Sequence, residues 1–198
     1  MAKLFYQGHG SYRITASDGR VIYVDPYAGG KESYALPAVL ILVTHQHRDH
    51  NQIDLCAKKE NCKIITNAEA LAGKKNNSFD IDGIHIESVE AKNLMHNPKD
   101  CVGYIITVDG IKIYASGDTS KTEQMKTFAG KNIDYALFST DGKFNMGMKE
   151  ASECAKIINA KHNIPVHMSP GKLFDRNRAE KFDAPNRLIL EPNQEIEL

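Results

Sequence analysis

Three histidines and an aspartate crowd into one short stretch of the sequence, as His45, His47, Asp49 and His50. They follow the apolar run 38–43 (AVLILV), whose length and branched side chains predict a buried strand. Ligand sites of α/β folds lie at the carboxyl ends of such strands, and side chains two residues apart in an extended chain face the same way. Converging imidazoles and a carboxylate suit a divalent transition metal, zinc being the commonest. The alternative is a solvated polar loop that happens to be rich in histidine.

The order His-x-His-x-Asp-His behind an apolar strand resembles the signature of the metallo-β-lactamase-fold hydrolases. The resemblance extends from Tyr6 to about Leu190 and is closest to the short, single-domain members, which include a sugar-phosphate lactonase. It implies an α/β fold, a four-layer αββα sandwich, formed by residues 1–198 as one domain. The periodicity of the residues, by itself, indicates only a mixed α/β chain.

The resemblance also assigns roles to residues further along the chain. His96 lies between two predicted strands, where the family has the third histidine of its first metal position. Asp118 matches the carboxylate that bridges two metals, and His167 matches the last histidine of the second position. The alternative for His96 is an exposed loop residue. The alternative for Asp118 is a cap of the predicted helix 121–128, because aspartate is a favoured N-terminal cap.

Two residues near the N-terminus belong to the same pattern. His9 follows a glycine after the first strand, and Asp25 precedes a proline at the end of a hairpin that turns at residues 18–19. The family opens with such Gly-His and Asp-Pro pairs. The resemblance therefore implies that His9 and Asp25 lie at the rim of the metal site and orient the imidazole ligands. A turn residue and a strand terminator are the alternatives.

Two divalent metal ions are the cofactors that the resemblance implies, most simply zinc, with manganese and iron as alternatives. The expected ligands are His45, His47 and His96 at the first position, Asp49, His50 and His167 at the second, and Asp118 at both. Such a pair lowers the pKa of a shared water towards neutrality, from about 15.7 in bulk, so that hydroxide forms without a strong base. The expected catalytic residues are Asp118 as the bridge and Asp49, which steers the hydroxide or carries a proton to the leaving group.

Hydrolysis of a small ester, lactone or phosphoester is therefore the expected activity. A metal-binding redox or sensor protein on the same scaffold is the alternative, although the chain has no flavin-binding extension and no cysteine spacing for a cluster. A noncatalytic scaffold is a third reading, and such a protein would be expected to have lost ligands. All seven ligand positions are filled here.

The elements that must position these residues follow from periodicity and turn signals. Hairpins are expected within residues 4–25 and 102–115. Further strands are expected at 38–43, 63–66, 84–89, 133–138, 164–168 and 187–190, and helices at 51–59, 68–72, 121–128 and 148–159. The loops 29–37, 93–99 and 142–148 are the expected rims of the site. The two remaining histidines, His85 and His162, are expected at the surface.

The composition limits the kinds of partner that the chain is expected to bind. Lys and Arg together number 25, as do Asp and Glu, so the basic excess typical of nucleic-acid binding is absent. No apolar run approaches the roughly 20 residues of a membrane span, and the N-terminus lacks the apolar core of a signal peptide. We therefore expect a cytoplasmic protein that acts on a small molecule, with neither nucleic acid nor membrane as partner. Its four cysteines show no Cys-x-x-Cys spacing and are expected to be free thiols.

Overall fold

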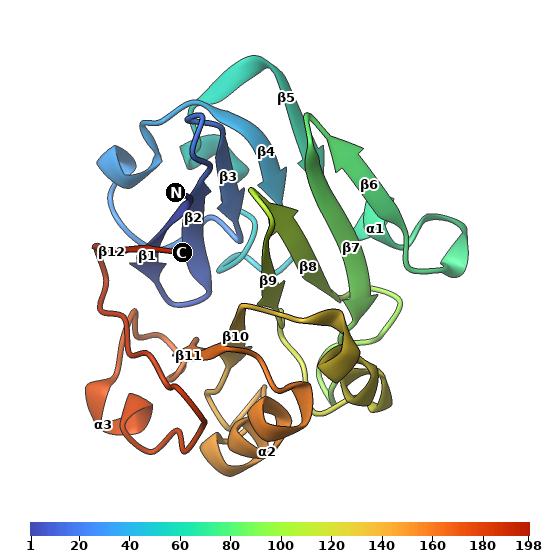
Figure 1. Cartoon of the computed structure of the whole chain (residues 1–198), viewed down its shortest axis with the longest axis vertical. Helices are drawn as coiled ribbons and strands as arrows, with labels where there is room; N and C mark the ends of the chain where they lie inside the picture. The colour runs from blue at the N-terminus through green and yellow to red at the C-terminus, as the bar shows by residue number, and fades with distance from the viewer.

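Two six-stranded sheets form the centre of the computed structural model, which describes residues 1–198 (Figure 1). The strands of the first sheet, in spatial order, are β12 (Gln194–Glu197), β1 (Lys3–Gly8), β2 (Ser11–Thr15), β3 (Val21–Val24), β4 (Ala38–Leu42) and β5 (Lys58–Ile65). Those of the second are β11 (His162–Val166), β10 (Tyr135–Ser139), β9 (Ile111–Ala115), β8 (Val102–Val108), β7 (Ile84–Glu90) and β6 (Ser78–Ile81). Each sheet joins antiparallel hairpins to two parallel strands, so the two halves of the chain are built alike.

Short helices form the two outer layers. They are α1 (Asn67–Ala70), α2 (Met148–Ile158), α3 (Arg176–Ala179) and the 3₁₀ helices η1 (Lys31–Tyr34), η2 (Ile53–Leu55), η3 (Ala72–Lys74) and η4 (Glu123–Lys131). Phe128 of η4 and Ile158 of α2 pack in an apolar cluster on the outer face of the second sheet. Tyr34 and Cys56 do the same on the first sheet. These layers confirm the predicted αββα sandwich.

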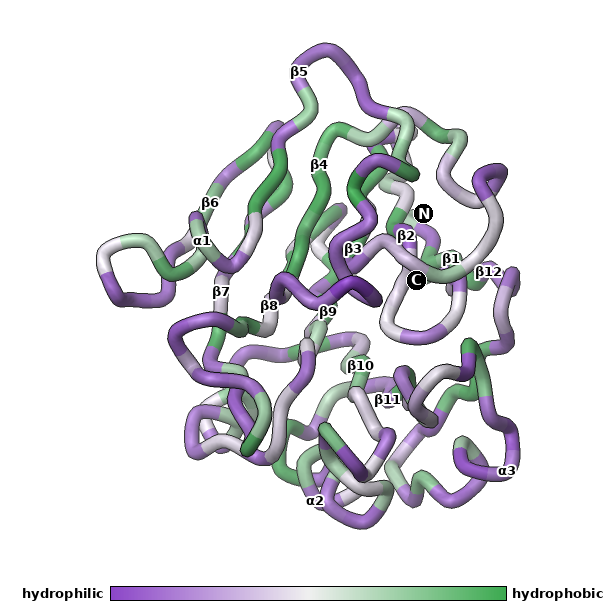
Figure 2. The backbone as a smooth tube through the Cα atoms, turned by 180° about the vertical axis from the view of Figure 1, so that it is seen from behind, coloured by the Kyte–Doolittle hydropathy of each residue, from purple (hydrophilic) through white to green (hydrophobic).

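Strand β4 shows why the run before the histidines is uniformly apolar. Leu40 and Leu42 belong to the core of 25 buried residues between the sheets, whereas Ile41 and Val43 belong to the cluster on the outer face. Both faces of the strand are therefore covered, which removes the need for polar alternation. Figure 2 shows β4 as hydrophobic and its neighbour β5, an edge strand, as mainly hydrophilic. Charged side chains on an edge oppose pairing with another chain.

Two predicted elements are wrong. No helix spans residues 51–59, because η2 is a single turn and β5 already begins at Lys58. The backbone N–H groups of Gln52 and Ala57 donate to carbonyls of other segments, at 2.8 and 2.9 Å, so tertiary hydrogen bonds replace helical ones. Residues 187–190 form one isolated bridge, and the last strand is β12, which pairs antiparallel with β1.

The other boundaries shift by small amounts. The predicted helix 121–128 is the 3₁₀ helix η4, and α1 is capped by Thr66, whose hydroxyl accepts from the backbone N–H of Ala68 at 3.1 Å. Strand β6 was not predicted, and it begins at the end of a polar turn. The hairpins and the helix at 148–159 are confirmed to within a few residues.

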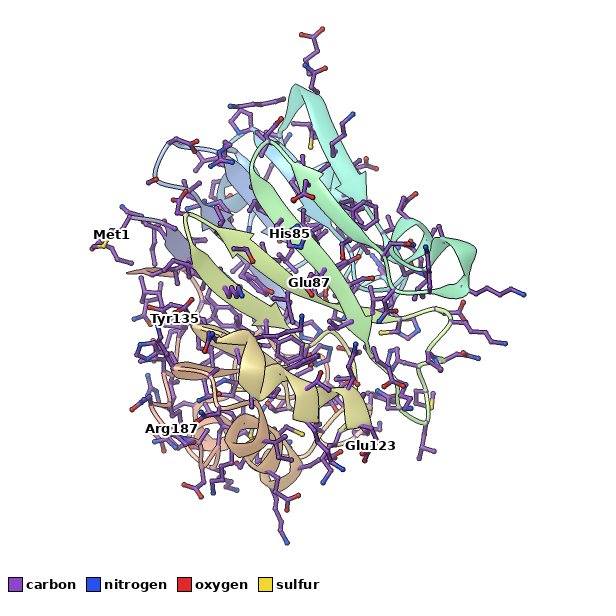
Figure 3. All side chains as sticks on the ribbon, turned by 45° about the vertical axis from the view of Figure 1, so that its right-hand side comes forward. Met1, His85, Glu87, Glu123, Tyr135 and Arg187 are labelled. Atoms are coloured by element: carbon purple, nitrogen blue, oxygen red, sulfur yellow. The ribbon has the colours of Figure 1, made fainter.

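The two histidines expected at the surface differ in environment. His85 lies with Glu87 on β7 (Figure 3), its side chain is 40% exposed, and its Nδ1 is 2.7 Å from a carboxylate oxygen of Asp80. His162 is half-buried at the start of β11, where its ring stacks on that of Tyr135 with centroids 4.9 Å apart. None of the helices is long and apolar enough to cross a membrane.

Candidate metal centre

The first predicted set of donors meets at one point. His45 and His47 follow the carboxyl end of β4, and His96 lies in the loop between β7 and β8. The Nε2 atoms of His45 and His96 each lie 3.1 Å from Nδ1 of His47. His45 and His96 are buried, whereas His47 is exposed, so the set opens towards solvent on one side.

Outer partners fix which nitrogen of each buried ring carries the proton. Nδ1 of His96 is 2.9 Å from the amide oxygen of Asn93, which also accepts from the backbone N–H of His96. Nδ1 of His45 is 3.0 Å from the hydroxyl of Thr44, which itself donates to Asp25 and so has a lone pair for the ring N–H. Both Nε2 lone pairs are therefore directed at Nδ1 of His47, an arrangement that suits a shared cation.

The second set repeats this arrangement. Nδ1 of His50 lies 2.8 Å from Asp25, and Nδ1 of His167 lies 3.3 Å from Asp141. The Nε2 atoms of both rings are buried without a hydrogen-bond partner, and Asp49 Oδ2 is 3.9 Å from that of His167. Buried polar atoms normally have partners, so these orphaned lone pairs fit a metal ligand set.

Asp118 lies between the two sets. One of its oxygens is 3.6 Å from His96 Nε2, 3.7 Å from His167 Nε2 and 3.9 Å from His45 Nε2, and the other is 3.6 Å from His50 Nε2. Donors around a tetrahedral zinc, with bonds of about 2.1 Å, are about 3.4 Å apart. The carboxylate accepts no backbone N–H, and η4 begins only at Glu123. The helix-cap alternative for Asp118 is therefore wrong.

Burial and charge set the protonation of the buried groups. Burial, reinforced by His50, lowers the pKa of His45 to about 2, so this ring is neutral. Burial would also lower the pKa of His50, but the carboxylates of Asp118 and Asp25 outweigh it and raise the value to about 9. Burial alone would raise the pKa of Asp118, and the surrounding imidazoles hold it below its usual range instead. Without metal, His45 is thus neutral and His50 is protonated beside the ionised Asp118, and a bound cation would take the place of the His50 proton.

His9 and Asp25 take different places. Asp25 accepts from the backbone N–H of Thr44 at 2.7 Å and faces His50, so it orients an imidazole as expected. His9 is buried within the second set and not at its rim, because its donor atom lies within 4.8 Å of those of Asp49, His50 and His167. Its Nε2 lies 3.2 Å from Asp49 Oδ2, and its ring centroid is 3.7 Å from that of His167. His9, Asp25 and His167 all have left-handed φ, of 53°, 46° and 45°, a conformation that non-glycine residues adopt at sites where the surroundings enforce it.

Known proteins match both the sequence and the fold. The model of the beta-lactamase superfamily domain matches residues 3–167. The chain belongs to the metallo-β-lactamase superfamily. It is 29% identical to a metal-dependent hydrolase of Thermococcus onnurineus and 30% identical to one of Thermococcus kodakarensis, over the whole of each chain. A metallo hydrolase from Ignicoccus hospitalis has the same fold, with a TM-score of 0.78, 23% identity, and coverage of 98% of this chain and 97% of that one. Within the superfamily, the chain falls in a family of metal-dependent hydrolases.

Two cavities are lined by the donor side chains described above. One of about 180 Å³ is lined by His47, Asp49, Asp118 and His167, with Met95 and Phe144 as apolar walls. A second, of about 350 Å³, is lined by His45, His47 and His96 and also includes Met95. The loops 93–99 and 142–148 thus border the site as expected. Loop 29–37 does not, because its Tyr34 packs under the first sheet.

Three residues that contact the ring Nδ1 atoms of the proposed ligands were not predicted from the sequence. They are Thr44, Asn93 and Asp141, which contact His45, His96 and His167. For Asp141 a signal existed, since an Asp-Gly pair follows the parallel strand β10 at the edge where the ligands gather. Its other oxygen accepts from the backbone N–H groups of Lys143 and Phe144 at 2.6 and 2.7 Å.

Proposed function

We propose that the chain, as one domain of residues 1–198, hydrolyses a small ester, lactone or phosphoester with two divalent metal ions, zinc being the first candidate. One observation carries this proposal. Imidazole nitrogens of both sets face the same buried carboxylate, Asp118, from 3.6 to 3.9 Å. Bound metal would give partners to the Nε2 atoms of His50 and His167 and to Oδ1 of Asp118, which are buried without a hydrogen-bond partner.

The proposed roles of the residues begin with those that would hold the metal ions. Two divalent ions, when bound, supply Lewis acidity and lower the pKa of a shared water. His45, His47 and His96 are the proposed holders of the first ion, and Asp49, His50 and His167 those of the second, with Asp118 reaching both. Asp25, Asn93 and Asp141 keep the ring N–H groups turned away from the ions.

Asp49 is the proposed proton carrier. Its side chain is 40% exposed, lines the cavity of about 180 Å³, and is bonded at Oδ2 to the buried His9. This contact leaves Oδ1 free to accept a proton from the attacking water and to return it to the leaving group. The hydrogen bond from His9, the largest effect, holds the pKa of Asp49 below its usual range, so the carboxylate is ionised at neutral pH.

The walls of the cavity support a small substrate. Met95 and Phe144 offer apolar surface on either side of the donors, and the two cavities at the donors measure about 180 and 350 Å³. Volumes of this order match ligands at or below the size that typical small-molecule sites hold.

Metal analysis and hydrolysis, measured on one preparation, test the proposal. We expect close to two equivalents of metal per chain and turnover of at least one member of a panel of p-nitrophenyl esters, lactones and phosphodiesters. Removal of the metal with a chelator should abolish turnover, and re-addition should restore it. A metal-free chain with full activity contradicts the proposal. A metal-loaded chain that changes oxidation state but hydrolyses nothing supports the redox or sensor alternative.

A further inference from the structure

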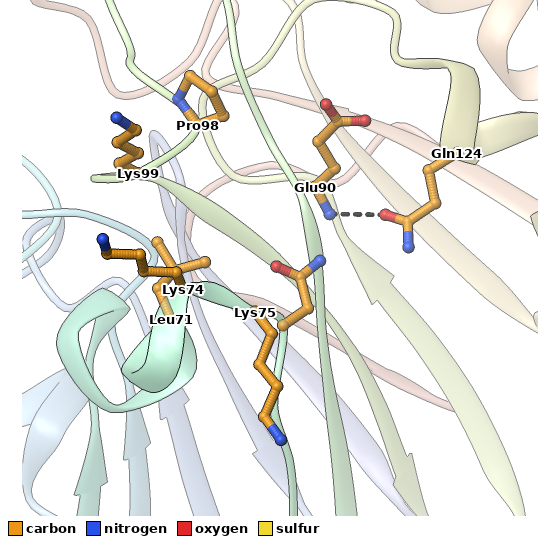
Figure 4. Close-up of a pocket in the computed structure, with 8 residues that line it drawn as sticks. Leu71, Lys74, Lys75, Glu90, Pro98, Lys99 and Gln124 are labelled. Carbon is orange, nitrogen blue, oxygen red and sulfur yellow. Dashed lines mark hydrogen bonds between the residues drawn. The ribbon is translucent and has the colours of Figure 1, made fainter.

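A cavity of about 730 Å³ borders the same loop that carries His96. Its lining includes Leu71, Lys74, Lys75, Glu90, Lys99 and Gln124. Figure 4 shows Lys74 and Lys99 on one side, Glu90 and Gln124 on the opposite side, and Lys75 turned away from the other two lysines. We call this cavity the lysine pocket. Its volume falls in the range of about 300–1,000 Å³ of small-molecule sites.

The charges in the lysine pocket are unbalanced. None of Lys74, Lys75 and Lys99 makes an ion pair, although the chain as a whole carries equal numbers of acidic and basic residues. The one carboxylate in the lining, Glu90, is already paired with Lys92 at 2.6 Å. The pocket therefore presents uncompensated positive charge.

Lysines near the pocket that do not line it behave differently. Lys92 pairs with Glu90, and on η4 Lys126 pairs with Glu123 at 2.6 Å. Lys121 also has a partner, Glu153, at 3.6 Å. The lack of partners is thus a property of the lining and not of every lysine in this part of the molecule.

Rigid turns hold the two lysines that face the cavity. Lys74 has a left-handed φ of 61°, in a turn whose carbonyls accept from the side-chain amide of Asn77, at 2.8 Å for Ala72. The backbone N–H of Lys99 donates to the side chain of Asn97 at 2.9 Å. Glu90 and Gln124 are joined across the opposite wall by a bond of 2.7 Å between the Glu90 N–H and the Gln124 amide oxygen. The backbone positions of Lys74 and Lys99 are therefore fixed, while their exposed side chains can adjust to an anion.

The lysine pocket and the cavity of about 350 Å³ at the donors are lined by different residues of the same two segments. In the loop that carries His96, Asn97 lines the cavity at the donors and Lys99 lines the lysine pocket. In the segment from α1 to η3, Asn67 lines the first and Lys74 the second. The two cavities therefore border the same two segments, and a substrate long enough to reach from one to the other would meet the lysines.

We propose that the lysine pocket binds the anionic group, a carboxylate or a phosphate, at the non-reacting end of the molecule that the metal centre hydrolyses. The inference rests on the proposed function for the reacting end. Ammonium groups bind both anions as point charges and contribute more when the surroundings supply no competing carboxylate. The substrate class is then an anionic ester, lactone or phosphoester and not a neutral one.

Paired substrates test the inference on the metal-loaded enzyme. p-Nitrophenyl butyrate is neutral, and the mono-p-nitrophenyl esters of linear dicarboxylic acids carry one carboxylate at a graded distance from the reacting bond. A carboxylate is preferred to a phosphate as probe because phosphate also binds metal ions. The double variant Lys74→Gln/Lys99→Gln removes the two charges. The double variant Lys149→Gln/Lys181→Gln removes two exposed, unpaired lysines elsewhere and serves as the matched control.

We expect the wild type to favour the carboxylate esters at one chain length. The Lys74→Gln/Lys99→Gln variant should lose about tenfold in kcat/KM for that ester, roughly threefold per lysine, through KM. Hydrolysis of p-nitrophenyl butyrate should stay unchanged, the control should behave as wild type, and 0.5 M salt should shrink the preference. Equal ratios of the two kcat/KM values in wild type and variant, at every chain length, overturn the inference.

A binding measurement separates this inference from the proposed function. If no ester is hydrolysed, the proposed function fails, and adipate is titrated into the ¹⁵N-labelled, zinc-loaded protein. Saturable shifts of the Lys74 and Lys99 amides that vanish in the double variant support anion binding by the pocket. Shifts that do not saturate, or that persist in the variant, overturn it.

Discussion

Replacement of Asp118 by asparagine removes one negative charge and little volume. Asparagine directs an amide N–H or a neutral oxygen at the ring nitrogens that face Asp118 from 3.6 to 3.9 Å. We expect metal affinity to fall about a hundredfold, since even residues that only orient ligands change affinity by about 10–100-fold. Two decades correspond to about 2.7 kcal/mol of metal-dependent stability. For 198 residues, with an unfolding entropy of about 2.1 cal/mol/K per residue, the metal-induced rise in Tm should shrink by about 6–7 °C.

The metal-free protein should also lose stability at neutral pH. The surrounding imidazoles hold the pKa of Asp118 below its usual range, so the ionised carboxylate stabilises the fold, and loss of its charge should lower the Tm in a chelator. Scanning calorimetry at two fixed free zinc concentrations, and without zinc, measures both effects. Asp80→Asn, at a side chain that is 80% exposed, is the matched control. If zinc raises the Tm of Asp118→Asn as much as that of the wild type, Asp118 does not bridge metals.

Three further predictions concern the same region. His47→Ala should reduce bound metal by about one equivalent and lower kcat/KM by about a hundredfold or more. Elemental analysis and ester turnover measure these two effects. His85→Ala, at a partly exposed histidine, should change neither. Gly117→Ala should lower the free energy of unfolding in urea by about 2–3 kcal/mol, because φ is +60° and the new Cβ would lie 2.5 Å from the carbonyl oxygen of Val102. Gly110→Ala, with φ of +78° and no atom within 4 Å, should lower it by only about 1 kcal/mol. Of the four thiols, only the half-buried one, Cys62, should react with a thiol reagent in the native protein, and fast labelling of more than one thiol would contradict the burial of the others.

Elements with strong local signals are predictable from the sequence. The hairpin at 102–115 has two apolar runs joined by a turn at Asp109-Gly110, and α2 has an apolar stripe at helical spacing, so both lie where these signals place them. The segment 51–59 fails because its backbone partners are carbonyls of residues 26 and 34, which no local pattern reveals. Strand β12 fails because its sequence, QEIE, has a single apolar residue.

In the candidate site, too, some features are predictable from the sequence and others are not. The seven expected ligands meet at one edge of the two sheets because each follows a strand end, which the sequence predicts. Their roles as ligands stay proposals. The partner of His167, Asp141, lies 26 residues before it, and the contact between His9 and Asp49 joins two loops 40 residues apart. Such pairings depend on how the sheets pack, and spacing along the chain does not encode them.

The proposed ligands come from both halves of the chain, and this determines when each metal position can form during synthesis. Each proposed metal position takes two donors from residues 45–50 and one from the second sheet, His96 or His167. Synthesis proceeds from the N-terminus, so a growing chain completes the first position early and the second only when His167 has emerged, after more than four-fifths of the residues. An interrupted chain, or one whose sheets have not docked, therefore lacks the paired centre.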